Sequence, residues 1–268
     1  MSEPRHPLIA RLLELAVDGP IVTAHRGDSR HHPENTLPAF AAAAQLGVPM
    51  QEFDVQASAD GVLLCIHDET LDRTTDAART LGPGGLVAQF SAADLMRLDA
   101  GSWKHPSCAG ARIPTLERAL SVMLPTCVPM IEHKAGKPQH YAELLRSLGL
   151  ADQVLLQSFD WNFLREARRL LPTTPLGLLG PGPEATAMDD RVHAAAREVG
   201  AGFVHWHAPE VTAEAVAAVH AQGMLLVTYT SDVQLAWCGG ARLGIDAMCT
   251  NDPSAMLAAR DQGLLRRG

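Results

Sequence analysis

Residues 202–250 have the sequence GFVHWHAPEVTAEAVAAVHAQGMLLVTYTSDVQLAWCGGARLGIDAMCT, and this stretch determines the fold class. It contains three short apolar runs, which are typical of buried strands, and the longer segments between them have the apolar spacing of helices. Strands that alternate with helices form a mostly parallel sheet. The stretch therefore predicts an α/β fold. Its three strands begin near residues 202, 224 and 246.

The same alternation extends back to the N-terminus. Setting aside one short run at 62–66, the predicted strands begin near residues 21, 50, 128, 153, 175, 202, 224 and 246. Eight strands in 268 residues suit a (β/α)8 TIM barrel, which is the predicted fold. An open doubly wound sheet is the alternative, but the first strand–helix connection lacks the G-x-G-x-x-G motif. We expect one domain over residues 1–268, with 68–113 as a small insertion over the C-terminal face.

The run at 62–66 predicts a β-hairpin. It follows the strand at 50–55 by too few residues for a parallel crossover. The dipeptide Asp60-Gly61 between them is a strong two-residue turn signal. If this dipeptide is the turn, Asp54 lies opposite His67, and directly opposed residues are close neighbours. We therefore expect the hairpin to rise above the barrel rim and return His67 to the level of Asp54.

Composition excludes several classes of protein. With 47% hydrophobic and 19% charged residues the chain is not disordered. Its formal net charge of −8 argues against a broad binding surface for nucleic acid or anionic membrane. No run has the length and apolarity of a transmembrane segment, and the first residues lack a secretory apolar region. The five cysteines are odd in number and lack C-x-x-C spacing, so we expect no disulfide framework and a cytoplasmic location.

Three carboxylates gather at the C-terminal ends of predicted strands, where a barrel assembles its chemistry. Glu52 and Asp54 are two residues apart on one strand and so point to the same face, and Glu132 ends the next barrel strand. An oxygen site of this kind suits Mg²⁺ or Ca²⁺, so we predict that these three residues bind one divalent cation. The alternative for either glutamate alone is a solvated strand end.

Histidines and fixed cations accompany this acidic group. His25 and His67 are the candidates for acid/base catalysis, because imidazoles can take up and return a proton near neutral pH. Arg26 and Lys134 supply positive charge, which together with the cation gives the site one net positive charge. That charge suits a singly negative phosphodiester, and arginine fits phosphate geometrically. The alternative for Lys134 is a structural ion pair with a glutamate of the acidic group.

The loop between the first strand and its helix has two candidate supporting residues. Glu34 and Asn35 could orient Arg26 from a position behind it. Thr36 or Asn35 could cap the following helix, and we expect this structural role for Thr36. Farther along the chain, His205 and His207 lie near a strand end, where either could contact a substrate.

Several motifs follow one another in a characteristic order. They are AHRGDSRHHPENTLPAF (24–40), EFDV with ADG after it (52–61), HDETLDRTT (67–75), IPTLERAL (113–120), IEHK (131–134), QSF (157–159) and GIDAMCTNDP (244–253). In this order, over nearly the whole chain, they resemble the glycerophosphodiester phosphodiesterase family.

The resemblance implies a TIM-barrel hydrolase that uses a divalent cation and cleaves glycerophosphodiesters, as small-molecule substrates, to glycerol 3-phosphate and an alcohol. It also implies a role for each matching residue: a catalytic pair, His25 and His67; metal ligands Glu52, Asp54 and Glu132; and phosphate contacts Arg26 and Lys134. The stretch 68–113 matches the family's insertion that covers the pocket. For the histidines we assign His25 as the base and His67 as the acid.

Departures from the family pattern concern packing and substrate. His133 replaces an apolar residue but alternates away from the site, so we expect it to change the barrel packing. Tyr229 and Ser231 stand where the family commonly has a tryptophan and an asparagine, which leaves the headgroup open. One alternative function is a phospholipase acting on lysophospholipids, which would need an apolar rim on the insertion. Another is a barrel that binds phosphodiesters without catalysis. A monomer and a homodimer are both compatible with the sequence.

Overall fold

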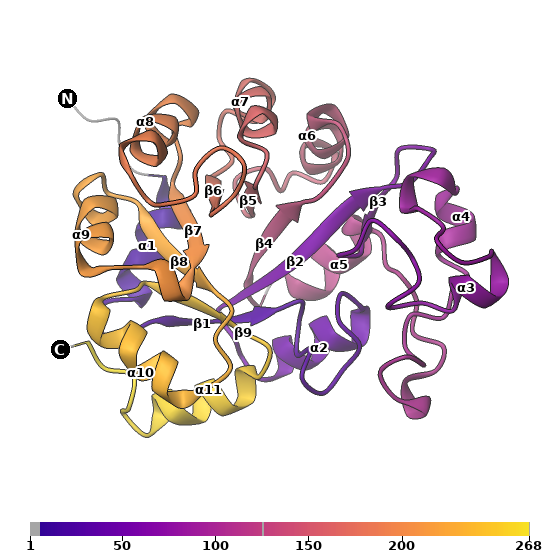
Figure 1. Ribbon diagram of the computed structural model, residues 1–268, viewed down its shortest axis with the longest axis horizontal. Helices are drawn as coiled ribbons and strands as arrows, with labels where there is room; N and C mark the ends of the chain where they lie inside the picture. The colour runs from indigo at the N-terminus through magenta and orange to yellow at the C-terminus, as the bar shows by residue number, and fades with distance from the viewer. Residues whose placement is uncertain (1–5, 125, 268) are drawn as a thin grey trace.

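Eight parallel strands close into a barrel, which confirms the predicted TIM-barrel fold (Figure 1). The structure is a computed structural model that describes residues 6–124 and 126–267. Neighbouring barrel strands are, in order, β1 (Ile21–His25), β2 (Met50–Ala57), β4 (Val128–His133), β5 (Leu155–Ser158), β6 (Leu176–Gly180), β7 (Phe203–His207), β8 (Leu225–Tyr229) and β9 (Ala247–Thr250), and β9 pairs with β1.

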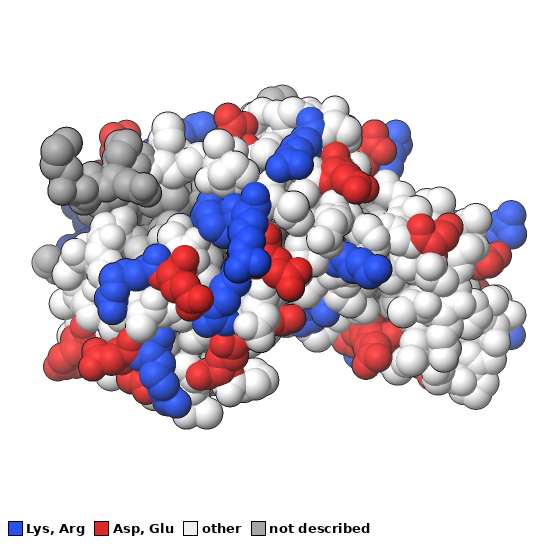
Figure 2. Space-filling model, turned by 90° about the horizontal axis from the view of Figure 1, so that it is seen from above, with Lys and Arg blue, Asp and Glu red and all other residues white. Residues whose placement is uncertain are grey.

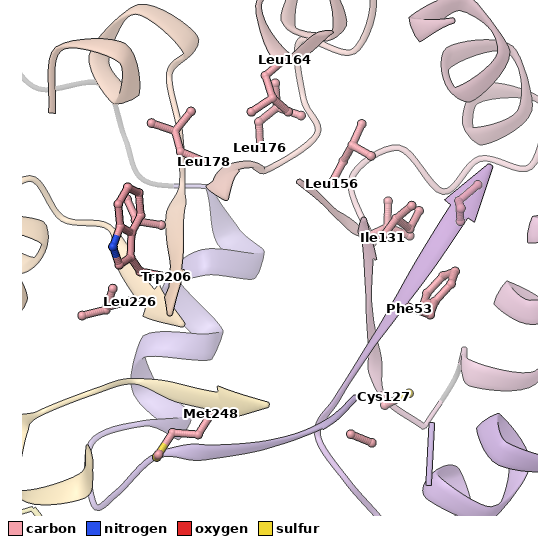
Figure 3. Packing of buried hydrophobic residues seen from close by; sticks show 14 of the residues in the cluster. Phe53, Cys127, Ile131, Leu156, Leu164, Leu176, Leu178, Trp206, Leu226 and Met248 are labelled. Atoms are coloured by element: carbon pink, nitrogen blue, oxygen red, sulfur yellow. The ribbon is translucent and has the colours of Figure 1, made fainter. Parts of the chain in front are cut away.

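Helices surround the barrel and cover its outer face (Figure 1). They are α2 (Leu37–Gln45), α5 (Leu116–Met123), α6 (Pro138–Ser147), α7 (Trp161–Leu170), α8 (Asp190–Val199), α9 (Ala213–Ala221), α10 (Gln234–Leu243) and α11 (Pro253–Asp261), with a short 3-10 turn η3 (Ala208–Glu210) before α9. Apolar strand residues such as Phe53, Ile131 and Trp206 belong to the cluster that packs beneath these helices (Figure 3). Burial of this alternating apolar set stabilises the ring of strands and helices.

The N-terminal helix α1 (Pro7–Leu15) packs on the barrel interior instead of joining the outer ring. Its buried residues Ile9 and Leu12 cluster with residues near the beginnings of the strands, among them Met50 and Leu225. The start of the barrel is therefore filled with apolar side chains. Functional residues are expected at the opposite end of the barrel, where the strands finish.

The predicted hairpin is present, but the predicted register is wrong by one residue. β3 (Leu63–Cys65) pairs antiparallel with β2. The amide of Ile66 donates to the carbonyl of Asp54 at 3.1 Å, so Asp54 lies level with Ile66 and not with His67. His67 comes directly after the paired residues, and its position near the site depends on the chain leaving the ladder there.

The turn explains the shifted register. Ser58 pairs with Val62, because the amide of Ser58 donates to the Val62 carbonyl at 3.0 Å, and the amide of Gly61 donates to the Ser58 carbonyl at the same distance. The loop therefore has three residues, 59–61, instead of two. Its last residue, Gly61, has a φ of 80°, the left-handed conformation that completes a type I turn with a bulge.

The insertion at 68–113 forms a lobe beside the hairpin, at the right of Figures 1 and 2. It contains α3 (Ala77–Thr80), η1 (Val87–Gln89), α4 (Ala92–Leu95) and η2 (Pro106–Cys108). Leu71, Val87 and Leu95 of the lobe cluster with Leu64 and Ile66 of the hairpin segment, which fastens the lobe to the barrel.

Surface properties follow the composition. On the face seen in Figure 2, Lys and Arg side chains lie among Asp and Glu side chains. Most apolar residues of the lobe serve its own packing: Val87 is buried and Phe90 packs against the cluster, whereas Leu81 is exposed. None of the helices in the described part of the chain has the length and apolar character of a membrane span. All five cysteines are free.

Candidate active site

The barrel brings the three predicted carboxylates together. Glu52 and Asp54 point inward from β2, and Asp54 is in register with Glu132 on β4. One carboxylate oxygen from each of the three residues lies within 4.8 Å of the others, and all three side chains are buried. Both oxygens of Glu52 lack a hydrogen-bond partner among residues 6–124 and 126–267. A buried carboxylate without a donor is costly unless something else neutralises it.

Crowding of the acidic groups perturbs their ionisation. Burial, followed by the charges of Asp54 and Glu132, raises the pKa of Glu52 well above its ordinary value. Burial and Asp54 raise the pKa of Glu132 to about 7. Burial alone would also raise the pKa of Asp54, but Arg26 and His67 beside it lower it. The three groups cannot all be ionised cheaply without a cation between them.

Two basic side chains lie against this acidic group. Lys134 Nζ is 2.7 Å from Glu132 Oε1 and 3.7 Å from Asp54 Oδ1. Arg26 Nε lies 3.1 Å from Asp54 Oδ2 on the other side. Lys134 thus makes an ion pair with Glu132, which was the structural alternative to a phosphate contact in the sequence analysis. Lys134 also lines a cavity of about 490 Å³ together with Phe159.

His25, at the end of β1, lies beside the acidic group with its Nε2 3.7 Å from Glu52 Oε2. Its Nδ1 lies 2.7 Å from Asn251 Oδ1. Because an amide oxygen can only accept, Nδ1 carries the proton and Nε2 faces the carboxylates. Burial and the charge of Arg26 lower the pKa of His25 to about 4, so the imidazole is neutral at pH 7.

His67 approaches the site from the hairpin side. Its Nε2 is 3.3 Å from Lys134 Nζ, and its Nδ1 is 2.5 Å from Asp68 Oδ1. The peptide that carries it is held by Gln56, whose side-chain amide donates to the carbonyls of His67 at 3.0 Å and Asp68 at 2.5 Å. His25 thus presents Nε2 to Glu52, whereas His67 presents Nε2 to Lys134, which itself contacts Glu132 and Asp54.

The loop after β1 is held in an unusual backbone conformation. Arg26 and Asn35 have φ values of 60° and 57°. The Asn35 amide donates to Asp54 Oδ2 at 2.9 Å and its oxygen accepts from the Asp54 amide at 3.2 Å, whereas Glu34 Oε1 accepts from Arg26 Nη1 at 2.8 Å. The backbone amide of Asn35 also donates to the Arg26 carbonyl, and its side chain shares Asp54 Oδ2 with Arg26 Nε. Thr36 precedes α2, but its hydroxyl donates to the Pro33 carbonyl instead of capping the helix.

Other sequence candidates lie off the centre. His205 is buried within the barrel, where Nδ1 lies 2.7 Å from Gln157 Oε1. His207 is at the rim and pairs with Glu210 at 3.2 Å. His133 points outward and stacks on a ring of α7, that of Phe163, with centroids 3.5 Å apart, as its alternation predicted.

Sequence reasoning missed several residues that hold the histidines. Asn251, Asp68 and Gln56 contact His25 or the His67 segment, and Asp232 Oδ2 accepts from Asn251 Nδ2 at 2.6 Å. Asn251 and Asp68 do stand inside the motifs that carried the resemblance, next to the reactive residues. Asp232 and Gln56 carried no comparable signal.

Comparisons with known proteins identify the family. The sequence model of the Glycerophosphoryl diester phosphodiesterase family matches residues 25–255. A glycerophosphodiester phosphodiesterase of Caldanaerobacter subterraneus is 31% identical over 92% of this chain and 98% of its own length. Among solved structures, a phosphodiesterase of Oleispira antarctica in complex with the product sn-glycerol-3-phosphate has a TM-score of 0.81 and 28% identity, covering 91% of this chain and 97% of that one. A glycerophosphodiester phosphodiesterase from Agrobacterium tumefaciens has a TM-score of 0.77 and 27% identity, covering 89% and 99%.

Proposed function

Because this chain belongs to the glycerophosphoryl diester phosphodiesterase family, we propose that it hydrolyses glycerophosphodiesters to glycerol 3-phosphate and an alcohol, using one divalent cation and two histidines. Glycerophosphodiester phosphodiesterase activity follows from the family and from the relatives that carry this name. The product in the complex of the Oleispira relative supports the glycerol 3-phosphate half of the substrate. The cation and the histidine roles are argued below from this chain's own residues.

The unpartnered carboxylate of Glu52 carries the case for a cation. Its two buried oxygens lack donors in the described chain, and oxygens of Asp54 and Glu132 lie within 4.8 Å. An all-oxygen donor set of this charge fits Mg²⁺ or Ca²⁺. When bound, such an ion would neutralise charge on a phosphate oxygen and lower the pKa of a coordinated hydroxyl.

Positive side chains would hold the substrate's phosphate. Arg26 and Lys134 flank Asp54 from two sides, at 3.1 and 3.7 Å. A phosphodiester lying over this group would meet a guanidinium and an ammonium. Burial opposes the charge on Lys134, but Glu132 and Asp54 raise its pKa, so it stays protonated.

The histidines divide the proton transfers. His25 is neutral with Nε2 free, so it accepts the proton of the attacking hydroxyl, which is that of water or of the glycerol 2-position. The new bond forms at phosphorus while the bond to the alcohol oxygen breaks. His67, whose Nδ1 lies 2.5 Å from Asp68 Oδ1, donates a proton from Nε2 to that oxygen. If water attacks, this step gives glycerol 3-phosphate directly, and the two histidines recover their starting states by exchanging protons with solvent. If the 2-hydroxyl attacks, the step gives a cyclic phosphodiester, which water then opens to glycerol 3-phosphate as His67 takes up a proton from the water and His25 returns its proton to the 2-oxygen.

A turnover assay tests the proposal. Release of glycerol 3-phosphate is followed for a panel of glycerophosphodiesters after EDTA treatment and after Mg²⁺ or Ca²⁺ is added back. We expect activity only with a cation. His67→Ala should lower kcat by about 10²- to 10⁴-fold, the usual contribution of general acid–base catalysis, without loss of fold. A folded, metal-loaded His67→Ala variant with the wild-type rate would disprove the assignment, and full activity in EDTA would disprove the cation.

A further inference from the structure

One arginine of the lobe joins two acidic side chains that come from separate parts of the chain. Arg73 donates to Asp68 through Nε at 2.5 Å and Nη2 at 3.0 Å. It also donates to Glu34 through Nη1 at 3.0 Å and Nη2 at 2.7 Å. The planar fork of a guanidinium can engage two carboxylates in this way, and the point charge of a lysine cannot. Asp68 follows the hairpin, whereas Glu34 belongs to the loop after β1.

The first carboxylate controls the orientation of the proposed acid. Asp68 Oδ1 lies 2.5 Å from His67 Nδ1, and Arg73 donates to both oxygens of the same carboxylate. Because Arg73 holds both oxygens of the Asp68 carboxylate, that carboxylate accepts the His67 hydrogen bond in one orientation. The ring of His67 is thereby held with Nε2 toward Lys134, at 3.3 Å.

The second carboxylate controls the proposed phosphate contact. Glu34 Oε1 accepts from Arg73 Nη2 and, at 2.8 Å, from Arg26 Nη1. Arg26 in turn lies against Asp54. Arg73 and Arg26 thus share one carboxylate oxygen, so a change in the Glu34 rotamer would move the guanidinium that faces the acidic group.

The backbone of this region is fixed without Arg73. Gln56, which is buried, donates to the carbonyls of both His67 and Asp68. The side chain of Arg73 is itself 44% exposed and lies outside the lobe's apolar cluster. Removing it should therefore free two carboxylate side chains without unfolding the segment that carries them.

We propose that Arg73 is a positioning residue for catalysis, which aligns His67 through Asp68 and Arg26 through Glu34. This inference rests on the function proposed above, because it assumes the roles given there to His67 and Arg26. Through this one side chain, the lobe is connected to the acid and to the phosphate contact of the barrel.

Substitutions at Arg73 and at a matched arginine test the proposal. Arg73→Met should lower kcat by about 10- to 100-fold, the range seen when a residue that orients a functional group is lost. Arg73→Lys should lie between wild type and Arg73→Met, since it keeps the charge but not the fork. Arg79 pairs with Asp76 at 3.1 Å on the same lobe and is 82% exposed, so Arg79→Met should leave kcat unchanged. A wild-type kcat for Arg73→Met would overturn the proposal.

A variant that lacks both carboxylates separates a positioning role of Arg73 from an effect on general stability. In an Asp68→Asn, Glu34→Gln variant, adding Arg73→Met should change kcat by less than about threefold, because groups that act as one unit are not additive. A full Arg73→Met effect in that background would overturn the proposal, since the arginine would then act by another route. If Arg73→Met is poorly folded, the same comparison is made with Arg73→Lys.

Failure of this inference can be told apart from failure of the proposed function. His67→Ala tests the proposed function by itself. If His67→Ala is inactive and Arg73→Met has the wild-type kcat, only the positioning role is wrong. If His67→Ala keeps the wild-type rate, the proposed function fails first.

Discussion

Replacing Glu132 by glutamine should stabilise the cation-free protein while abolishing its response to divalent cations. In the cation-free chain this buried carboxyl sits with Glu52 and Asp54, and its pKa is raised from 4.5 to about 7. Each tenfold change in an acid dissociation constant is worth about 1.4 kcal/mol, so ionising Glu132 in the folded state costs on the order of 3 kcal/mol. A neutral amide of the same shape avoids that cost, although it weakens the ion pair with Lys134.

The sign of the pH dependence follows from the direction of the shift. Below pH 4.5 the carboxyl is protonated in both the folded and the unfolded chain and contributes nothing. Between pH 4.5 and about 7 the unfolded chain releases the proton first, so the contribution of Glu132 destabilises the fold increasingly as pH rises. Above pH 7 the penalty stays constant. The benefit of Glu132→Gln should therefore be small at pH 4.5 and largest, up to about 3 kcal/mol, at pH 8.

Urea denaturation in EDTA at these two pH values measures the effect, and repetition with Mg²⁺ or Ca²⁺ measures the linkage to binding. Wild type should gain stability with added cation by mass action, and Glu132→Gln should gain little. Glu166→Gln, which changes an exposed glutamate of α7, is the matched control and should behave as wild type. The reasoning is refuted if Glu132→Gln is less stable than wild type in EDTA at pH 8, or if it keeps the full cation response.

Two further predictions concern the supports of the site and the fold. Asn251→Ala should lower kcat about tenfold, because His25 loses the acceptor that orients its Nδ1; an unchanged kcat, measured with the thermal midpoint as a control for folding, would contradict this. Gly61→Ala should destabilise the fold by about 1 kcal/mol or more, because its φ of 80° is unfavourable for alanine. Gly239→Ala, on α10 with open space at the new Cβ, should instead stabilise by about 0.4 to 1 kcal/mol, and equal effects of the two substitutions in urea denaturation would refute the turn geometry.

Sequence pattern predicted the barrel because the pattern and the packing share one cause. Apolar strands and amphipathic helices alternate, and each strand end is located by the same alternation, so Glu52, Asp54 and Glu132 could be placed on neighbouring strands from their positions alone. Their convergence needs only a closed parallel sheet. That requirement is global, and it does not depend on any one turn.

The register of the hairpin could not be predicted in the same way. The dipeptide Asp60-Gly61 fits a two-residue turn and also the last two positions of a three-residue turn. With the observed pairing, Leu64 and Ile66 join the lobe's apolar cluster and Leu63 and Cys65 join the barrel's. Because residues 62–66 are apolar at every position, either register would place apolar side chains on both faces, so the hydrophobic pattern leaves the register open.

The two proposed catalytic histidines differ in what holds them, and the difference bears on their roles. The strands that carry the acidic residues are held by their backbone hydrogen bonds. His25 and His67 lie where strands end, so another side chain must orient each imidazole. For His25 that side chain is the neutral amide of Asn251, whose Oδ1 accepts from Nδ1. For His67 it is the carboxylate of Asp68, whose pKa is lowered to about 2 chiefly by hydrogen bonds from Arg73, so the ring faces an ionised group. The group at Nδ1 is thus a neutral amide for His25 and an ionised carboxylate for His67. This difference in the supporting residues distinguishes two rings that sequence spacing alone could not tell apart.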